Sequence, residues 1–68
     1  MHRYYVNKNA QHNRDHEVHK SGCDRMPLEH NRIYLGIFAS CRGAVSEAKK
    51  HSSQSNGCYY CSNECHTS

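Results

Sequence analysis

CYYC at residues 58–61 and HKSGC at residues 19–23 are the two stretches that decide the expected fold. A Cys-x2-Cys turn holds two sulfur atoms at a spacing that suits one metal ion, and His-x3-Cys across a Ser-Gly turn offers a second pair of ligands. The two pairs lie far apart in sequence, so one ion bound by both would join an early hairpin corner to a late loop. The predicted metal ligands are His19, Cys23, Cys58 and Cys61.

Zinc is the ion that this ligand set favours. It accepts thiolate sulfur at about 2.3 Å and imidazole nitrogen at about 2.0–2.1 Å in a tetrahedron. Four protein ligands fill that tetrahedron and leave no position for a water molecule, so the predicted ion is structural and not a Lewis acid or a source of hydroxide. We therefore predict no catalytic residue, and we expect that the protein is not an enzyme.

The chain itself has little apolar material from which to build a core. It has 68 residues, of which 35% are hydrophobic, and it has no tryptophan. Domains of this size draw only about 3–5 kcal/mol from the hydrophobic core, whereas zinc supplies on the order of 10–16 kcal/mol in zinc-finger peptides. We expect one domain over residues 1–68, with an ordered core over residues 3–61 and a flexible tail over residues 62–68.

Charge, hydropathy and cysteine usage exclude several classes of protein. Nine Lys and Arg against six Asp and Glu give 9 − 6 = +3 without a long basic run, so any binding to nucleic acid should be weak. The chain has no apolar stretch of about 18 residues and no signal-peptide pattern, so we expect no membrane association and a cytoplasmic location. In a reducing compartment, five cysteines favour metal binding over disulfides, and the odd count agrees.

Three segments have the alternation or the residue types of β-strands. These are residues 3–7, residues 15–20 and residues 32–38 (RIYLGIF). The third is the most apolar and is predicted at the centre of the sheet, with Ile33, Leu35 and Ile37 on one face and Tyr34 and Phe38 on the other. In the second, His16 and Val18 share one face and Glu17 and His19 share the other.

One helix follows the strands. Ser40 is a suitable N-cap for a helix over residues 41–50, whose apolar stripe is Ala44, Val45 and Ala48. After a polar connector, Asn56-Gly57 is predicted as a turn that leads into CYYC. The expected fold class is therefore α+β: a small three-stranded antiparallel sheet with one helix, stapled by a structural zinc.

The order of these features resembles a known family. His19-x3-Cys23, an apolar strand, a helix opened by a small polar residue, a glycine and Cys58-x2-Cys61 resemble the zinc module of Ada-type DNA methylphosphotriester repair proteins and its relatives in other bacterial proteins. The resemblance covers roughly residues 18–61 and implies the same four zinc ligands. In that family, the first ligand of the early pair is a cysteine whose thiolate accepts the methyl group. His19 occupies that position here, so the resemblance implies the scaffold without the repair nucleophile.

Other cysteines and histidines offer alternatives. Cys65 or His66 could replace His19 as a ligand, because Cys58, Cys61 and Cys65 lie close together in sequence. Cys41, at the first helical position, is a candidate reactive thiolate, although a half-buried structural cysteine is the simpler interpretation. His12 and His16, with Asp15 and Glu17 nearby, suggest a second metal site or a nuclease-like cluster, but HEVH at residues 16–19 lacks the HExxH spacing, and a solvated loop explains these residues more simply.

Two functions from different classes fit the sequence. The first is a monomeric, non-enzymatic binding module held by zinc, whose partner is a protein or, as the resemblance would allow, a nucleic acid. The alternative is a thiol-based redox activity through the Cys58-x2-Cys61 pair, with Cys41 or Cys65 as further candidates. Thiol protection in the metal-loaded protein separates the two, because zinc ligands are protected and a redox dithiol is not.

Overall fold

The computed structural model describes residues 1–11 and 13–66. Its strands are β1 (His2–Asn7), β2 (His16–Lys20), β3 (Arg32–Phe38) and β4 (Ser55–Gly57), and its helix is α1 (Cys41–Ala48). Two short 3-10 helices, η1 (Glu29–Asn31) and η2 (Asn63–Cys65), precede β3 and follow the CYYC stretch. The fold is α+β, as the sequence predicts.

The sheet has four strands and is mixed, so the expectation of three antiparallel strands is wrong. The strand order is β3-β1-β2-β4, with β1 antiparallel to both of its neighbours and β4 parallel to β2. The prediction that residues 32–38 lie at the sheet centre is also wrong, because β3 is an edge strand. Its apolar character comes from packing against α1 on one face and not from burial between two strands.

The faces of β3 differ from the simple alternation. Tyr4 pairs with Gly36 but Tyr5 pairs with Tyr34, so the register shifts by one residue between the two pairs. This irregularity reverses the direction of the side chains beyond it. Phe38 therefore packs against the core together with Ile33, while Ile37, predicted on the same face as Ile33, is 51% exposed.

The polar segment before CYYC forms a strand. The sequence predicts a polar connector over residues 51–55 and a turn at Asn56-Gly57, but His16 pairs with Ser55 and Val18 with Gly57 in a parallel ladder. A strand of Ser, Asn and Gly has no apolar period to reveal it, and it is fixed by its position beside β2. Cys58 therefore directly follows a strand that is hydrogen-bonded to β2.

The helix begins where the sequence predicts and is shorter at its end. The Ser40 side chain accepts a hydrogen bond from the Arg42 backbone N–H at 3.3 Å, which is the expected N-cap, and Lys49 is the C-cap. Ala44 and Ala48 of the predicted stripe are fully buried. They pack on one face of the sheet, against a core that consists of Tyr4, Val6, Val18, Leu35, Cys41, Ala44 and Ala48.

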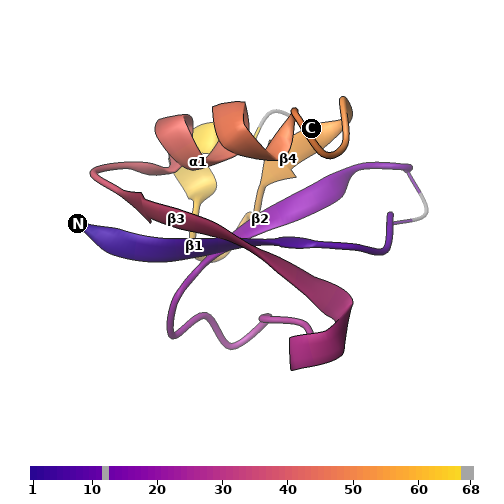
Figure 1. Cartoon of the computed structure of the whole chain (residues 1–68), viewed down its shortest axis with the longest axis horizontal. Helices are drawn as coiled ribbons and strands as arrows, with labels where there is room; N and C mark the ends of the chain where they lie inside the picture. Colours follow the sequence, from indigo (N-terminus) through magenta and orange to yellow (C-terminus); the bar gives the residue numbers. More distant parts are fainter. Residues whose placement is uncertain (12, 67–68) are drawn as a thin grey trace.

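The two faces of the sheet have different covers. Helix α1 lies on one side, and the connection from β2 to β3, with η1, runs on the other (Figure 1). Val18 faces the helix side and is buried, whereas its neighbour His19 points to the opposite side and is also buried. The side with the β2–β3 connection is the side on which His19 and its neighbours gather.

Candidate metal centre

Four side chains from two distant parts of the chain meet at one point. They offer one imidazole nitrogen and three sulfur atoms, and these ligand atoms all lie within 4.8 Å of one another. Two of the residues are buried and two are half-buried. The structure thus brings together the four residues that the sequence predicts as metal ligands: His19, Cys23, Cys58 and Cys61.

The early pair is positioned by the end of β2 and a tight turn. His19 is the penultimate residue of the strand, and Ser21-Gly22 turns the chain so that the Cys23 N–H donates to the Lys20 carbonyl at 3.1 Å. Gly22 has φ +89°, a conformation that residues with a Cβ rarely adopt. The turn therefore directs the Cys23 sulfur back to within 3.6 Å of His19 Nδ1.

The late pair is positioned by β4 and the turn that follows it. The Cys58 N–H donates to the Val18 carbonyl at 2.9 Å, which ties the start of the CYYC stretch to β2. The Ser62 N–H then donates to the Cys58 carbonyl at 2.8 Å and closes the turn around the two cysteines. Because both pairs are anchored to β2, a single strand sets the geometry of the whole cluster.

Three of the six separations between the ligand atoms are close to the edges of a tetrahedron around one ion, and all six are within 4.8 Å. With metal–sulfur and metal–nitrogen bonds of zinc length, tetrahedron edges are about 3.8 Å between two sulfurs and about 3.6 Å between sulfur and nitrogen. The Cys23 and Cys58 sulfurs are 3.9 Å apart, and His19 Nδ1 lies 3.6 Å from the Cys23 sulfur and 3.9 Å from that of Cys61. No disulfide joins these sulfurs, and Cys23, Cys58 and Cys61 are the free cysteines of the described residues.

Backbone N–H groups point at the sulfur atoms. The Lys20 N–H donates to the Cys61 sulfur at 3.2 Å, and the Arg25 N–H donates to the Cys23 sulfur at 3.4 Å. Such bonds favour thiolates, but burial dominates in the metal-free protein and raises the pKa of the Cys58 and Cys61 thiols. A divalent cation reverses that preference, because it binds and stabilises the thiolate form directly.

The imidazole is prepared to act as a neutral ligand. Burial lowers the pKa of His19, against the opposing effect of the nearby Glu17 carboxylate, and the side chain is only 1% exposed. Its Nδ1 faces the sulfurs, while its buried Nε2 has no hydrogen-bond partner. Glu17 Oε1 lies 3.7 Å from this nitrogen, on the same face of β2. This is the place where a carboxylate orients a metal-bound histidine in many metalloproteins.

Part of the cluster is open to solvent. A hollow of about 570 Å³, bordered by Lys20 and Arg25, contains the half-buried Cys23 and Cys61 in its wall. The Arg25 guanidinium lies over the Tyr60 ring, 4.2 Å from its centroid. Cys58 and His19, by contrast, are each only 1% exposed. Small molecules such as a chelator can therefore reach two of the four ligands.

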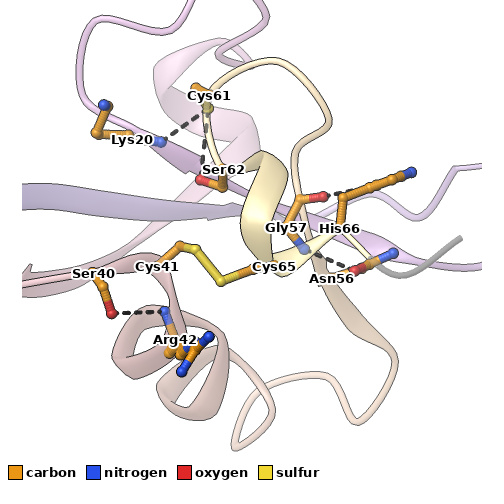
Figure 2. The surroundings of a disulfide bond; sticks show 10 residues. All are labelled: Lys20, Ser40, Cys41, Arg42, Asn56, Gly57, Cys61, Ser62, Cys65 and His66. Carbon is orange, nitrogen blue, oxygen red and sulfur yellow. Dashed lines mark hydrogen bonds between the residues drawn. A yellow bond between two sulfur atoms is a disulfide. The ribbon is translucent and has the colours of Figure 1, made fainter.

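The remaining two cysteines form a disulfide, which excludes two of the alternatives that the sequence left open. Cys41 and Cys65 are bonded to each other across 24 residues of sequence, so neither is a free thiolate and Cys65 does not replace His19 in the cluster. Figure 2 shows this disulfide joining the start of α1 to η2, apart from Cys61. The preference for metal over disulfides was therefore too general. Three of the five cysteines meet in the cluster, and the arithmetic 5 − 3 = 2 is the signal that could have predicted the pair.

The other candidate histidines have different surroundings. His66 lies with its Nδ1 3.1 Å from the Gly57 carbonyl oxygen and its ring against Tyr59, and it is not part of the cluster (Figure 2). His16 Nδ1 is 2.9 Å from the Asn7 carbonyl oxygen, across the β1–β2 hairpin. His12 lies outside the described residues, as do residues 67 and 68 of the predicted flexible tail. Within the described residues, the single group able to hold a metal is this cluster of one histidine and three cysteines.

Comparisons with known proteins give no family for this chain: no family model, no curated protein and no solved structure matches it. Among the described residues, no helix is both long and apolar enough to cross a membrane. The function is therefore inferred from the chemistry of the cluster.

Proposed function

We propose that this chain is a small module held together by a structural zinc ion and that it acts as a non-enzymatic binding domain. The observation that carries this proposal is the cluster of one histidine and three cysteines, in which three interatomic separations of 3.6–3.9 Å are close to the edges of a zinc-centred tetrahedron. The donor set also favours zinc, because three thiolates and one imidazole are soft ligands, whereas magnesium and calcium prefer oxygen.

A closed ligand shell argues for a structural role. Four protein atoms complete the tetrahedron, so the ion has no free position at which to activate water or polarise a substrate. The site also lies where a structural ion stabilises a fold most, between the turn after β2 and the turn after β4. Cys23 and Cys58, which come from these two turns, are 35 residues apart in sequence.

The resemblance to Ada-type zinc modules is part of this proposal. The order of ligand pairs, strand and helix supports a scaffold of that type, and His19 in place of a cysteine removes the methyl-accepting thiolate. The binding partner would then be a protein or a nucleic acid, and the module itself would be monomeric. The proposal therefore takes from the family its scaffold and its metal ligands, and not its repair activity.

Metal analysis tests the proposal. The tag-free protein should contain one equivalent of zinc, and His19→Ala or Cys58→Ser should lose it. The double variant Cys41→Ser/Cys65→Ser is the matched control, because it removes two cysteines outside the cluster and should retain zinc. His19→Cys should also retain zinc, because it substitutes one zinc ligand for another. A wild-type protein that is folded and free of metal would contradict the proposal.

Thiol mapping tests the redox alternative and the location together. Under the zinc proposal, Cys23, Cys58 and Cys61 resist alkylation until the metal is removed. If Cys58 and Cys61 instead oxidise reversibly to a disulfide with the fold retained, the redox function is correct. The proposed cytoplasmic location suits three reduced ligands, whereas the Cys41–Cys65 bond is typical of oxidising compartments, so the redox state of that pair in cells decides the location.

A further inference from the structure

The two edge strands of the sheet differ in how far the rest of the chain covers them. At one edge, β4 has only three residues, all buried, and η2 packs against it. The Gly57 N–H donates to the Asn56 side-chain oxygen at 2.9 Å, and the Gly57 carbonyl oxygen lies 3.1 Å from His66 Nδ1 (Figure 2). That edge is closed by the chain itself.

The other edge, β3, is open. It is the longest strand, with seven residues, and between described residues no backbone hydrogen bond outside the sheet ladder involves Arg32–Phe38. In an edge strand, every second residue directs its N–H and C=O groups away from the sheet. Proteins usually protect such edges with lysine, proline or inward-pointing charges, and β3 has one charged residue and no proline. Its irregular register is its only visible protection.

A cationic and aromatic hollow lies on the face of the sheet beside this edge. The Tyr5 and Tyr34 rings are 5.3 Å apart, and the Arg32 guanidinium lies over Tyr5, 4.9 Å from the ring centroid. Arg32 Nη1 donates to the Pro27 carbonyl at 3.1 Å, which fixes the guanidinium and leaves its other donors available. The hollow is lined by Arg3, Tyr5, Glu29, Arg32 and Tyr34.

The charges of the hollow are unbalanced. It has two guanidinium groups and one carboxylate, and none of the ion pairs between described residues involves any of the three. A strand added beside β3 would place alternate side chains over this face, about 4.8 Å from those of Arg32 and Tyr34. A carboxylate at such a position can reach the Arg32 guanidinium and form charge-assisted hydrogen bonds.

From the open edge and the adjacent hollow, we propose that β3 binds an extended, acidic segment of a partner protein by strand addition. Backbone hydrogen bonds to Arg32–Phe38 supply the affinity, and the Arg3–Arg32 hollow selects an acidic side chain. This inference deepens the binding function proposed above and rests on it. It differs from that function in naming the surface and the chemistry of the partner.

A second copy of this chain is a poorer occupant. Its own β3 would bring Arg32 and Tyr34 to the hollow and no carboxylate, since RIYLGIF contains no acidic residue. The net charge of +3 adds repulsion between copies. Charge complementarity therefore favours a partner that supplies carboxylates.

The test uses the zinc-loaded, 15N-labelled full chain and a synthetic peptide that alternates glutamate and valine. Addition of the peptide should shift the amide resonances of Arg32–Phe38 and slow their hydrogen exchange, while those of β4 stay unchanged. A peptide with lysine in place of glutamate, and an acidic peptide with N-methylated backbone at alternate positions, should each bind at least about tenfold more weakly, because they lack the charge or the strand donors.

Charge-reversal variants localise the effect. Arg32→Glu should weaken binding of the acidic peptide by about tenfold or more, whereas Arg42→Glu, an exposed arginine on α1, should leave it unchanged. Arg3→Glu is a second variant at the hollow, and no hydrogen bond or ion pair of its side chain with a described residue would be lost. Zinc content and spectral dispersion, measured on each sample, separate a failure of this inference from a failure of the zinc proposal.

Several results would overturn the inference. These are an absence of peptide-induced changes at β3, equal binding of the lysine or N-methylated peptide, and protection of β3 amides that grows with protein concentration, which would indicate a second copy. Binding of single-stranded DNA at the same tyrosines, with no response to the acidic peptide, would assign the surface to nucleic acid instead.

Discussion

Glu17→Gln tests whether the carboxylate beside His19 supports metal binding. Glu17 Oε1 is 3.7 Å from His19 Nε2, the one buried side-chain polar atom without a hydrogen-bond partner among the described residues. When His19 binds a metal through Nδ1, its Nε2 carries a hydrogen, and a nearby carboxylate orients the ring and makes it a better ligand. The substitution keeps the shape of the side chain and removes its charge.

The structure sets the size of the effect. Loss of such a carboxylate lowers metal affinity by about 10–100-fold in general. The separation of 3.7 Å is longer than a hydrogen bond, and the Glu17 side chain is 23% exposed, so solvent partly screens its charge. We therefore expect the lower end of the range, about tenfold, which corresponds to about 1.4 kcal/mol in the free energy of zinc binding.

Competition with a chromophoric chelator for zinc, at fixed pH and salt, measures this affinity. The matched control is Glu47→Gln, which removes the same charge from the exposed face of α1, where Glu47 pairs with Lys50 at 3.1 Å. The control should bind zinc as tightly as the wild type. If both variants bind equally well, or if Glu17→Gln binds more tightly, then Glu17 does not support the histidine and the reasoning is wrong.

Three further outcomes follow from the fold. Removal of zinc by a chelator should abolish the dispersion of amide resonances, because the small core cannot hold the sheet alone, and a dispersed spectrum of the metal-free protein would contradict this. Cys41→Ala/Cys65→Ala should lower the free energy of unfolding of the zinc-loaded protein by about 3.5 kcal/mol, as expected for a cross-link across 24 residues, and should leave the zinc content unchanged. Urea unfolding measures the first effect, and loss of zinc would contradict the second. Gly57→Ala should weaken zinc binding more than Gly43→Ala does. A Cβ at Gly57 would meet the Ser62 backbone oxygen at 2.5 Å, whereas one at Gly43 would meet only the movable Phe38 ring at 2.8 Å; equal zinc affinities of the two variants would show that the close approach at Gly57 does not matter.

The candidate site was the most predictable feature of this protein. A CxxC turn and a His-x3-Cys turn are local patterns whose spacing is set by the covalent chain, so they are visible without knowledge of the fold. The N-cap at Ser40 and the bounds of β3 were predictable for the same reason, because each depends on neighbours in sequence. The position of Glu17 beside His19 was predictable from period-2 alternation, which puts the two side chains on one face of the strand.

What the sequence could not provide was the arrangement of distant segments. Nothing in Ser55–Gly57 has the composition of a strand, and only the free edge of β2 makes it one. The bond between Cys41 and Cys65 requires that the start of α1 meet η2, a contact that no local pattern encodes. The most apolar strand, β3, is predicted at the sheet centre and lies at its edge. A strand covered by a helix and a strand between two others are both rich in apolar residues, so composition does not distinguish them.

The amino-acid sequence by itself predicted the four residues of the candidate metal cluster, the helix α1 and three of the strands, since these depend on short spacings and on the period of apolar residues. Tertiary structure alone decided the fourth strand and the open edge at β3, because each of them depends on which surfaces meet after the chain has folded. The cluster itself belongs to both: spacing supplied its two halves, and the parallel pairing of β4 with β2 brought them within reach of one ion.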